Sequence, residues 1–453
     1  MSDLERAFEA LKNKQADIDT LFDYAEGRQP LRYSTKRLQE AFKNIDVHFE
    51  QNWCSVVIDA AMDRVTIAGW DTENKQQNDA LDKVFKRLDI GVAAYNAHYD
   101  ALVAREGFII AWKNDAGEIE LYHNSPSLCH MFYDENSPNK KSFAAKWYRE
   151  DVGGGSFVLR MILYYPERIE YYNTQPVKAT PDQASAFEPS EIPVSENTYG
   201  AIPVFHFRTN RRNKSDLQNI LTLQDAVNKL LSDMMVAAEY GAYKQRYIIS
   251  NTDTTGLRNS PNMIWSIPSD SDGKTQVGEF SAQDLDTYLN AIDKLANSVA
   301  IISRTPKHYF FGAGANLSGE ALLAMEAPLT KKVEQIEANL NGTWRELGAF
   351  ILQLETGQVL PASEITPIWS PPESVQPFTE AQTIKTLVDA QVPLVTAVRM
   401  RGWDQSQIDA MLADVKKQKE EETTTAIAAL ERARINSEQN NEGVNSNVNP
   451  QPN

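Results

Sequence analysis

The chain of 453 residues is 42% hydrophobic, so it can bury one large core or two or three smaller ones. Its 45 Lys and Arg against 62 Asp and Glu leave a formal charge of -17, which disfavours tight DNA binding because phosphate backbones are held by excess positive charge. No apolar run approaches the roughly 18 residues of a membrane span, and the N-terminus lacks the pattern of a signal peptide. We therefore expect a soluble protein made in the cytosol, without membrane contact.

Helical and strand-like patterns alternate up to about residue 214. Apolar residues at helical spacing predict a helix within 1–30, a helix around 52–61 and an amphipathic helix over 80–105. A short strand is expected at 64–70. β-Branched and aromatic runs bounded by turn residues predict further strands at 107–113, 118–123, 143–149, 157–165, 168–172 and 199–207.

Two stretches within this part indicate loops. The triple glycine at 153–155 lies between two predicted strands and fits a hairpin loop. Residues 174–196 hold several prolines and few large apolar side chains, so they are expected to form a surface loop.

The pattern becomes strongly helical at Ser215, which is a good N-cap for a helix that ends near Gly241. A compact segment over 245–280 follows, with strands expected at 246–249 and 263–267. Leu285, Leu289, Ile292, Leu295, Val299 and Ile302 then predict a helix over 283–303.

A glycine-bearing loop at 308–317 separates that helix from the next, which is predicted to start at Ser318 and to continue towards Leu354. Pro328 lies inside it and should kink it, because proline removes a backbone donor. A proline-rich connection over 361–378 precedes shorter helices near 380–390, 392–400 and 405–417. The polar tail, 426–453, is expected to be disordered.

Searches for catalytic and metal motifs find no convincing site. Residues 268–279 resemble parts of a phosphate-binding loop and of a calcium loop, but each pattern lacks an essential position, so a solvated turn is expected. His123, Cys129 and His130 are close in sequence without the spacing of a metal site, which favours ordinary packing. We expect no metal, no cofactor and no catalytic residue.

Several short phrases, in this order and spacing, resemble the phage portal proteins of the family typified by the portal of Bacillus phage SPP1. The resemblance extends from about residue 20 to 420. The phrases are Tyr24-Ala25-Glu26-Gly27, Pro30-Leu31, Asn52-Trp53-Cys54, Gly69-Trp70, Ser215-Asp216-Leu217, Leu223-Gln224-Asp225-Ala226, Tyr240-Gly241-Ala242, Gln245-Arg246-Tyr247, Leu317-Ser318-Gly319-Glu320-Ala321-Leu322 and Gly402-Trp403.

The resemblance implies an α+β portal fold with named parts. These are an α/β wing over 1–214, a stem helix over 215–245, a small β-containing clip over 246–281, a second stem helix over 282–308, a tunnel loop over 309–318, a kinked wing helix with a return strand over 319–375, a helical crown over 376–425 and the disordered tail over 426–453.

The tunnel loop is the part expected to approach DNA. Small, neutral side chains there would let a duplex slide without strong attraction. Arg304, Lys307 and His308 stand beside the loop; two interpretations stay open, contact with phosphate or simple capping of the preceding helix. The expected loop residues are Phe310, Phe311, Gly312, Ala313, Gly314, Ala315, Asn316 and Leu317.

The function implied by the resemblance is that of a portal subunit. Such a subunit would form a homo-oligomeric ring, normally a dodecamer, at one capsid vertex and provide the channel for packaging and ejection of double-stranded DNA. Its partners would be the terminase large subunit, the major capsid protein and scaffold, and the head–tail connector proteins. It would assemble in the host cytoplasm and remain in the virion.

Two other classes of protein stay open at this point. A phage morphogenesis factor or enzyme with an unrecognised site would show a deep pocket lined by converging polar residues. A scaffold that binds partners without forming a channel would be mainly polar and rich in heptads, which the predicted sheets argue against.

Overall fold

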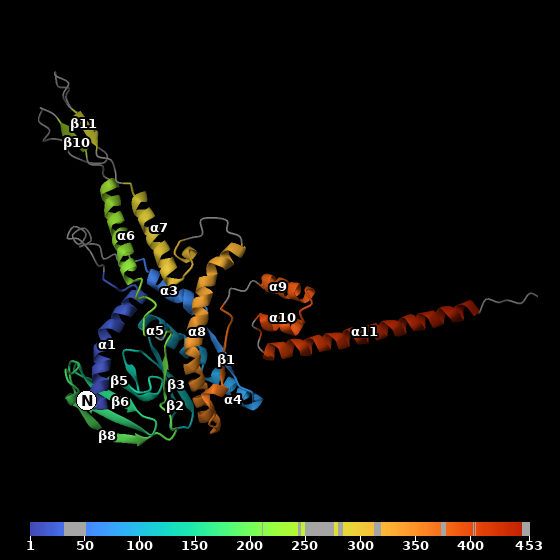
Figure 1. Cartoon of the computed structure of the whole chain (residues 1–453), viewed down its shortest axis with the longest axis horizontal. Coiled ribbons are helices and arrows are strands. Elements are labelled where there is room, and N and C mark those ends of the chain that lie inside the picture. The colour runs from blue at the N-terminus through green and yellow to red at the C-terminus, as the bar shows by residue number, and fades with distance from the viewer. Residues whose placement is uncertain are drawn as a thin grey trace, which may run out of the picture. The chain divides into compact units, whose positions relative to one another are not determined.

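The computed structural model describes residues 1–30, 51–210, 212–242, 246–249, 276–279, 284–311, 319–372, 377–401, 403 and 405–445. The chain forms two units, Met1–Pro372 and Glu373–Asn453. Helices and antiparallel sheets are both present in the first unit, which confirms the α+β class (Figure 1). Within the described residues, no helix is both long and apolar enough to cross a membrane.

The N-terminal helix α1, Asp3–Glu26, connects two parts of the hydrophobic core. Near its start, Phe8 and Leu11 pack with the side chains of a five-stranded sheet. Near its end, Leu21 and Tyr24 pack with a larger cluster formed mainly by helices. One helix therefore ties both clusters together.

Three further helices follow α1: α3, Trp53–Met62; α4, Lys75–Arg87; and α5, Ile90–Ala104. The prediction of one helix over 80–105 was wrong, because Asp89 has φ 46° and its left-handed backbone separates α4 from α5. The helical spacing of apolar residues continues across this break, so the sequence pattern does not show where one helix ends and the next begins. At the end of α5 the chain turns closely, since a Cβ on Gly107 would lie 2.1 Å from the carbonyl oxygen of Ala97.

Two antiparallel sheets stack on each other through an apolar layer. Phe108, Ile110 and Val204 from one sheet share this layer with Met131 and Tyr164 from the other. The first sheet has the order β3-β2-β9 and the second the order β4-β5-β6-β7-β8. The bounds are β2 Gly107–Lys113, β3 Ile119–Asn124, β9 Val204–Phe207, β4 Cys129–Tyr133, β5 Lys141–Gly153, β6 Ser156–Tyr164, β7 Arg168–Thr174 and β8 Phe187–Glu196.

Two of these strands, β4 and β8, were not predicted. The expected loop over 174–196 was wrong for β8, because an edge strand needs partners on one side only and so tolerates proline. Its pairing with β7 also shifts between Glu170 and Tyr172, which disguises the strand in the sequence. The hairpin predicted at 153–155 is present, with positive φ at all three glycines.

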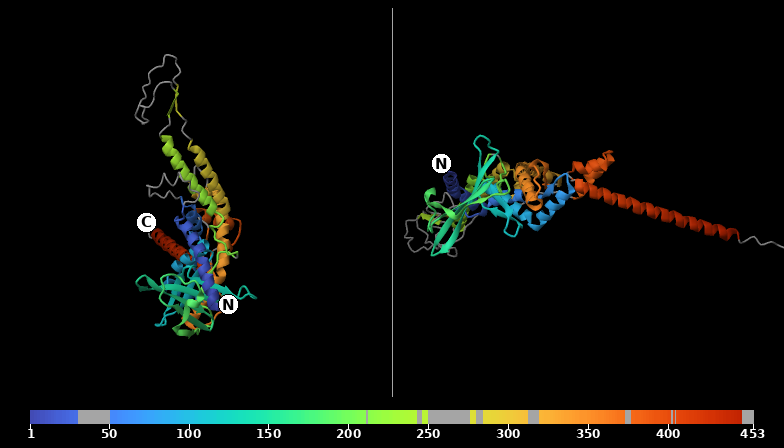
Figure 2. Two further views of the ribbon diagram at one scale, coloured as in Figure 1. Left: turned by 90° about the vertical axis from the view of Figure 1, so that its left-hand side faces the viewer. Right: turned by 90° about the horizontal axis from the view of Figure 1, so that it is seen from below.

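Helices α6, Leu221–Ala242, and α7, Asp286–Ser303, lie side by side and extend away from the sheets (Figures 1 and 2). Ser215 does not begin α6 as expected; its hydroxyl accepts a hydrogen bond from the Leu217 amide at 3.1 Å, and turns precede the helix. Beyond the helices, β10, Arg246–Ile249, pairs with β11, Gln276–Glu279. The strand predicted at 263–267 lies outside the described residues.

The longest helix of this unit is α8, Gly319–Thr356, which contains Pro328. Its first turns lie at an angle to the rest (Figure 1). Further along, its buried face packs into the main cluster, where the Trp70 indole donates to the Trp344 carbonyl oxygen at 2.8 Å. The chain then returns through β12, Thr366–Trp369, which pairs antiparallel with β1, Ile67–Asp71.

The second unit consists of α9, Pro377–Asp389, α10, Leu394–Met400, and α11, Gln405–Asn445. The expectation of disorder from residue 426 was wrong as far as Asn445, because α11 continues to that residue. A polar composition indicates that a segment lacks a core of its own, but this stretch contains no proline and several Ala, Glu and Arg, which favour helix. Residues 446–453 lie outside the described part.

Candidate functional site

The segment that follows α7 begins with a reversal of the backbone. Arg304 is left-handed, with φ 59°, and its amide donates to the Ala300 carbonyl oxygen. A single 3-10 turn, Lys307–Tyr309, comes next, and the described segment ends at Phe311. Of the residues expected in the tunnel loop, Gly312, Ala313, Gly314, Ala315, Asn316 and Leu317 lie outside the described residues.

An aromatic anchor holds the start of this loop. The buried indole of Trp53 packs edge-on against Phe310, with ring centroids 5.6 Å apart, and against Phe311 at 5.9 Å. Phe310 is only 7% exposed, whereas Phe311 is 37% exposed. The ring of Phe310 therefore belongs to the core, and the proximity of residues 310–317 to DNA stays a prediction.

Four side chains form a polar cluster beside the anchor, which we name the loop clasp: Arg64, His308, Tyr309 and Glu326. Glu326 forms an ion pair with Arg64, and the Tyr309 hydroxyl donates to Glu326 Oε1 at 3.2 Å. Arg64 Nη2 also donates to the Tyr309 hydroxyl at 3.1 Å. His308 Nε2 lies 3.4 Å from Glu326 Oε1. The clasp therefore joins residues on both sides of the loop to the turn after α3.

The three basic residues beside the loop have different surroundings. Lys307 Nζ lies 3.0 Å from Asp293 Oδ1, and His308 belongs to the loop clasp. Arg304 is exposed and forms no ion pair with any residue in the described part of the chain. Of the three, Arg304 is therefore the one whose side chain is exposed and without an ion pair among the described residues.

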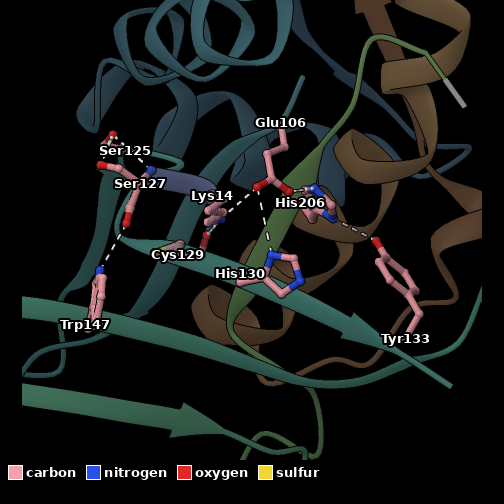
Figure 3. Close-up of polar contacts among 9 residues, drawn as sticks. All are labelled: Lys14, Glu106, Ser125, Ser127, Cys129, His130, Tyr133, Trp147 and His206. Carbon is pink, nitrogen blue, oxygen red and sulfur yellow. Dashed lines mark hydrogen bonds and ion pairs between the residues drawn. The ribbon is translucent and has the colours of Figure 1, made fainter. Parts of the chain in front are cut away.

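A second polar cluster lies at the seam between the two sheets (Figure 3), and we name it the sheet joint: Lys14, Glu106, His130, Tyr133 and His206. Lys14 Nζ lies 2.7 Å from Glu106 Oε1, and His206 Nε2 lies 3.1 Å from Glu106 Oε2. His130 Nδ1 is 4.0 Å from Oε1. On its other side, His206 Nδ1 lies 3.0 Å from the Tyr133 hydroxyl. The sheet joint thus links α1, β4 and β9.

Charges in the sheet joint compensate each other at neutral pH. Burial raises the pKa of Glu106, but the Lys14 charge, together with His206 and His130, outweighs it and holds that pKa well below its usual range. Burial and the Lys14 charge lower the pKa of His130 to about 4, and burial also lowers the pKa of His206. Glu106 is therefore charged against Lys14 while both imidazoles are neutral.

An open hollow of about 340 Å³ lies beside the sheet joint, between α1 and the start of β2. Its charged groups are engaged with each other, since Lys14 pairs with Glu106 and Arg105 pairs with Asp17. Cys129 is fully buried, and burial raises its pKa to about 12, so it is no nucleophile. The arrangement holds elements together and does not assemble a nucleophile with its base.

Among the described residues, no group of three or more His, Cys, Asp or Glu side chains is placed to hold a metal ion. His123 lies 2.7 Å from Asp100, whereas His130 lies 4.0 Å from Glu106. Residues 268–275, part of the stretch that resembles phosphate and calcium loops, lie outside the described range.

Neither cluster was predicted from the sequence. Arg64 and Glu326 are 262 positions apart, and Lys14 and Glu106 are 92 positions apart. No local spacing signals such pairs. The one usable signal was Pro328, which marks the region of α8 next to Glu326 as irregular.

Comparisons with known proteins point to one family. The portal proteins of Mycobacterium phages D29 and L5 are 29% and 28% identical to this chain over 192 residues, which is 39% of this chain and 39% of each relative. A chain of the neck of a native GTA particle, described with C12 symmetry, aligns with a TM-score of 0.46 and 10% identity, over 88% of this chain and 93% of that one.

The family model covers far more of the chain than these pairwise matches. It is described as phage portal protein, SPP1 Gp6-like, and it matches residues 13–425, from the first half of α1 into α11. The chain therefore belongs to the SPP1 Gp6-like family of phage portal proteins.

Proposed function

We propose that this chain is one subunit of a portal ring through which double-stranded DNA enters and leaves the capsid. The family match over residues 13–425 carries this proposal. The paired helices α6 and α7, which extend from the sheets, supply long surfaces for contact with neighbouring copies (Figure 1). Contacts of this head-to-tail kind close into a ring, and twelve copies are the number that the family suggests.

Charge supports passage of DNA in preference to tight binding. The formal charge of -17 repels phosphate, and α7 exposes Asp286 and also Asp293, which pairs with Lys307. A wall of this kind lets a duplex slide. Arg304 offers a local phosphate contact at the base of the tunnel loop, whose expected residues run from Phe310 to Leu317.

The proposed domain roles follow the same scheme. Residues 1–214 act as the wing, α6 and α7 as the stem, β10 and β11 as part of the clip, α8 as the kinked wing helix, and α9 to α11 as the crown. The partners are the terminase large subunit, the major capsid protein, scaffold and head–tail connectors. Terminase supplies ATP hydrolysis, so this chain acts without a catalytic residue or cofactor at the portal vertex of the virion.

Electron microscopy of the purified protein tests this function. We expect rings with a central hole wide enough for a DNA duplex, and native mass spectrometry should give twelve subunits. If the protein is monomeric when purified alone, it should be co-expressed with the scaffold and capsid proteins of the same phage and imaged again. Small closed oligomers without a channel under both conditions would overturn the proposal.

A further inference from the structure

We propose that the loop clasp is a positioning device that ties the residues before the tunnel loop to the first turns of α8 and to the turn after α3, and thereby holds the two flanks of the loop in a fixed relation. The inference rests on the proposed portal function. It assigns Arg64, His308, Tyr309 and Glu326 a role in DNA passage although none of them needs to touch DNA.

The first argument is the connectivity of the clasp. His308 and Tyr309 precede the loop, and Glu326 follows it in α8. Glu326 receives the Tyr309 hydroxyl hydrogen bond at 3.2 Å and lies 3.4 Å from His308 Nε2. One carboxylate therefore connects the two ends of the loop directly.

The second argument is the attachment of this carboxylate to the wing. Arg64 lies between α3 and β1 and meets both Glu326 and the Tyr309 hydroxyl. Its side chain is 10% exposed and that of Glu326 is 17% exposed, so solvent screens the pair only weakly. The planar guanidinium suits two acceptors at once, which a lysine ammonium would not hold in the same geometry.

The third argument concerns the bend in α8. Pro328 has no amide hydrogen, so the helix loses the hydrogen bond that its amide would give to the Ala324 carbonyl oxygen. The first turns of α8 lie at an angle to the rest (Figure 1), and the backbone restrains this angle less firmly than in a regular helix. Glu326, two positions before the proline, supplies a side-chain restraint where the backbone lacks one.

The aromatic anchor shows why the clasp is needed. Trp53 packs on Phe310 and Phe311 and so holds the first end of the loop through apolar contact. Glu326 belongs to the second end. Without the clasp, the first end would remain anchored while the bent start of α8 would be released.

The test uses assembled rings and replaces Glu326→Gln, which keeps the side-chain size but removes the charge. Hydrogen exchange of the amides in the first turns of α8, before Pro328, should become at least about tenfold faster, because the ion pair and the charge-assisted hydrogen bond of Glu326 that hold this end are lost. DNA packaged per particle, measured with the cognate motor, should fall. The ring size should remain that of wild type, and the protein should stay folded with a melting temperature only a few degrees lower.

The matched control is Glu334→Gln, which changes another α8 glutamate whose partner, Lys331, is exposed. It should leave exchange and packaging unchanged. Arg64→Gln should reproduce the effect of Glu326→Gln, and the double variant should add little to either single change, as expected for two halves of one interaction.

The outcomes separate the two proposals. If the Glu326→Gln and Glu334→Gln variants form intact rings with equal hydrogen-exchange rates and equal amounts of packaged DNA, the clasp proposal is overturned and the portal function stands. Wild-type protein that forms no ring under any assembly condition would overturn the function itself. If Glu326→Gln does not fold, Tyr309→Phe takes its place; unchanged exchange in that variant would also overturn the clasp.

Discussion

Glu106 and Glu326 are two carboxylates with similar companions and different settings. Each is mostly buried, each pairs with one cation, and each has an imidazole and a tyrosine hydroxyl nearby. The partners of Glu106 lie on α1, β4 and β9, which are complete helices and strands of the first unit. Those of Glu326 lie on a turn and on a 3-10 segment beside the loop. The same kinds of groups thus join complete helices and strands around Glu106, whereas around Glu326 they hold residues that flank a loop.

The hydrogen-bond routes also differ. In the sheet joint, Tyr133 bonds to His206 and reaches Glu106 only through that ring. In the loop clasp, Tyr309 bonds to Glu326 directly and also accepts from Arg64. Arg64 keeps the Tyr309 hydroxyl as a polar partner if Glu326 is lost, and Lys14 keeps the Cys129 carbonyl oxygen if Glu106 is lost. The partners of Glu106 hold its pKa well below its usual range, so stability should depend more on Glu106.

The largest expected effect is that of Glu106→Gln on folding. Lys14 would remain as a buried charge without its counter-ion, so the free energy of unfolding should fall by about 3–5 kcal/mol in urea denaturation.

Glu326→Gln should lower the free energy of unfolding by about 1–3 kcal/mol, because Tyr309 still contacts Arg64. Asp182→Asn, which affects an exposed ion pair with Lys12, should change it by less than about 1 kcal/mol. Equal losses at Glu106 and Glu326 would contradict the distinction drawn between the two clusters.

Acid should weaken the sheet joint through His130. The pKa of His130 is about 4 when folded and 6.5 when unperturbed, so between these values the unfolded chain binds the proton more readily. Its contribution to stability is complete above pH 6.5 and is lost as the pH falls towards 4. His130→Gln should reduce this loss by about 1–3 kcal/mol, measured as unfolding free energy at intervals from pH 7 to pH 4.

Glu337 in α8 provides a control, because its titration changes the stability in the opposite direction to that of His130. Burial, and secondarily Glu334, raises the pKa of Glu337 from 4.5 to about 7, so its proton stabilises the folded state as the pH falls below 7. Glu337→Gln should therefore steepen the acid loss that His130→Gln reduces. A pH profile that neither variant alters would show that these groups titrate alike in both states.

Two tyrosine hydroxyls allow a further comparison of the two clusters. Tyr133→Phe removes the bond to His206, and Tyr309→Phe removes the bonds to Arg64 and Glu326. Each should cost about 1 kcal/mol in thermal or urea unfolding. Only Tyr309→Phe should speed hydrogen exchange beside the tunnel loop. Faster exchange there in Tyr133→Phe would mean that the two clusters are not independent.

The regular elements of the fold could be largely predicted from the sequence. Periodic apolar residues gave α1, α3, α6 and α7, and β-branched runs gave most strands, because these signals are local. The break at Asp89 escaped because a single left-handed residue does not disturb the spacing of its neighbours. The edge strand β8 escaped because its prolines and register shift look like a loop.

The candidate site could be predicted only in outline. The resemblance indicated where the tunnel loop begins, and the residues alone indicated Pro328. Which cation meets Glu326 depends on how α3 and α8 pack, and which cation meets Glu106 depends on how α1 crosses the seam between the sheets. The burial of Phe310 against Trp53 was not predicted, because it is a tertiary contact that no local pattern encodes.

The two cysteines of the chain have a practical consequence. Cys54 and Cys129 are both fully buried, and burial raises the pKa of each thiol to about 12. In the folded protein, neither sulfur offers a thiolate to maleimides or other alkylating reagents. A cysteine introduced on the surface of this protein will therefore carry a fluorophore, a spin label or a gold cluster without a background from its native thiols.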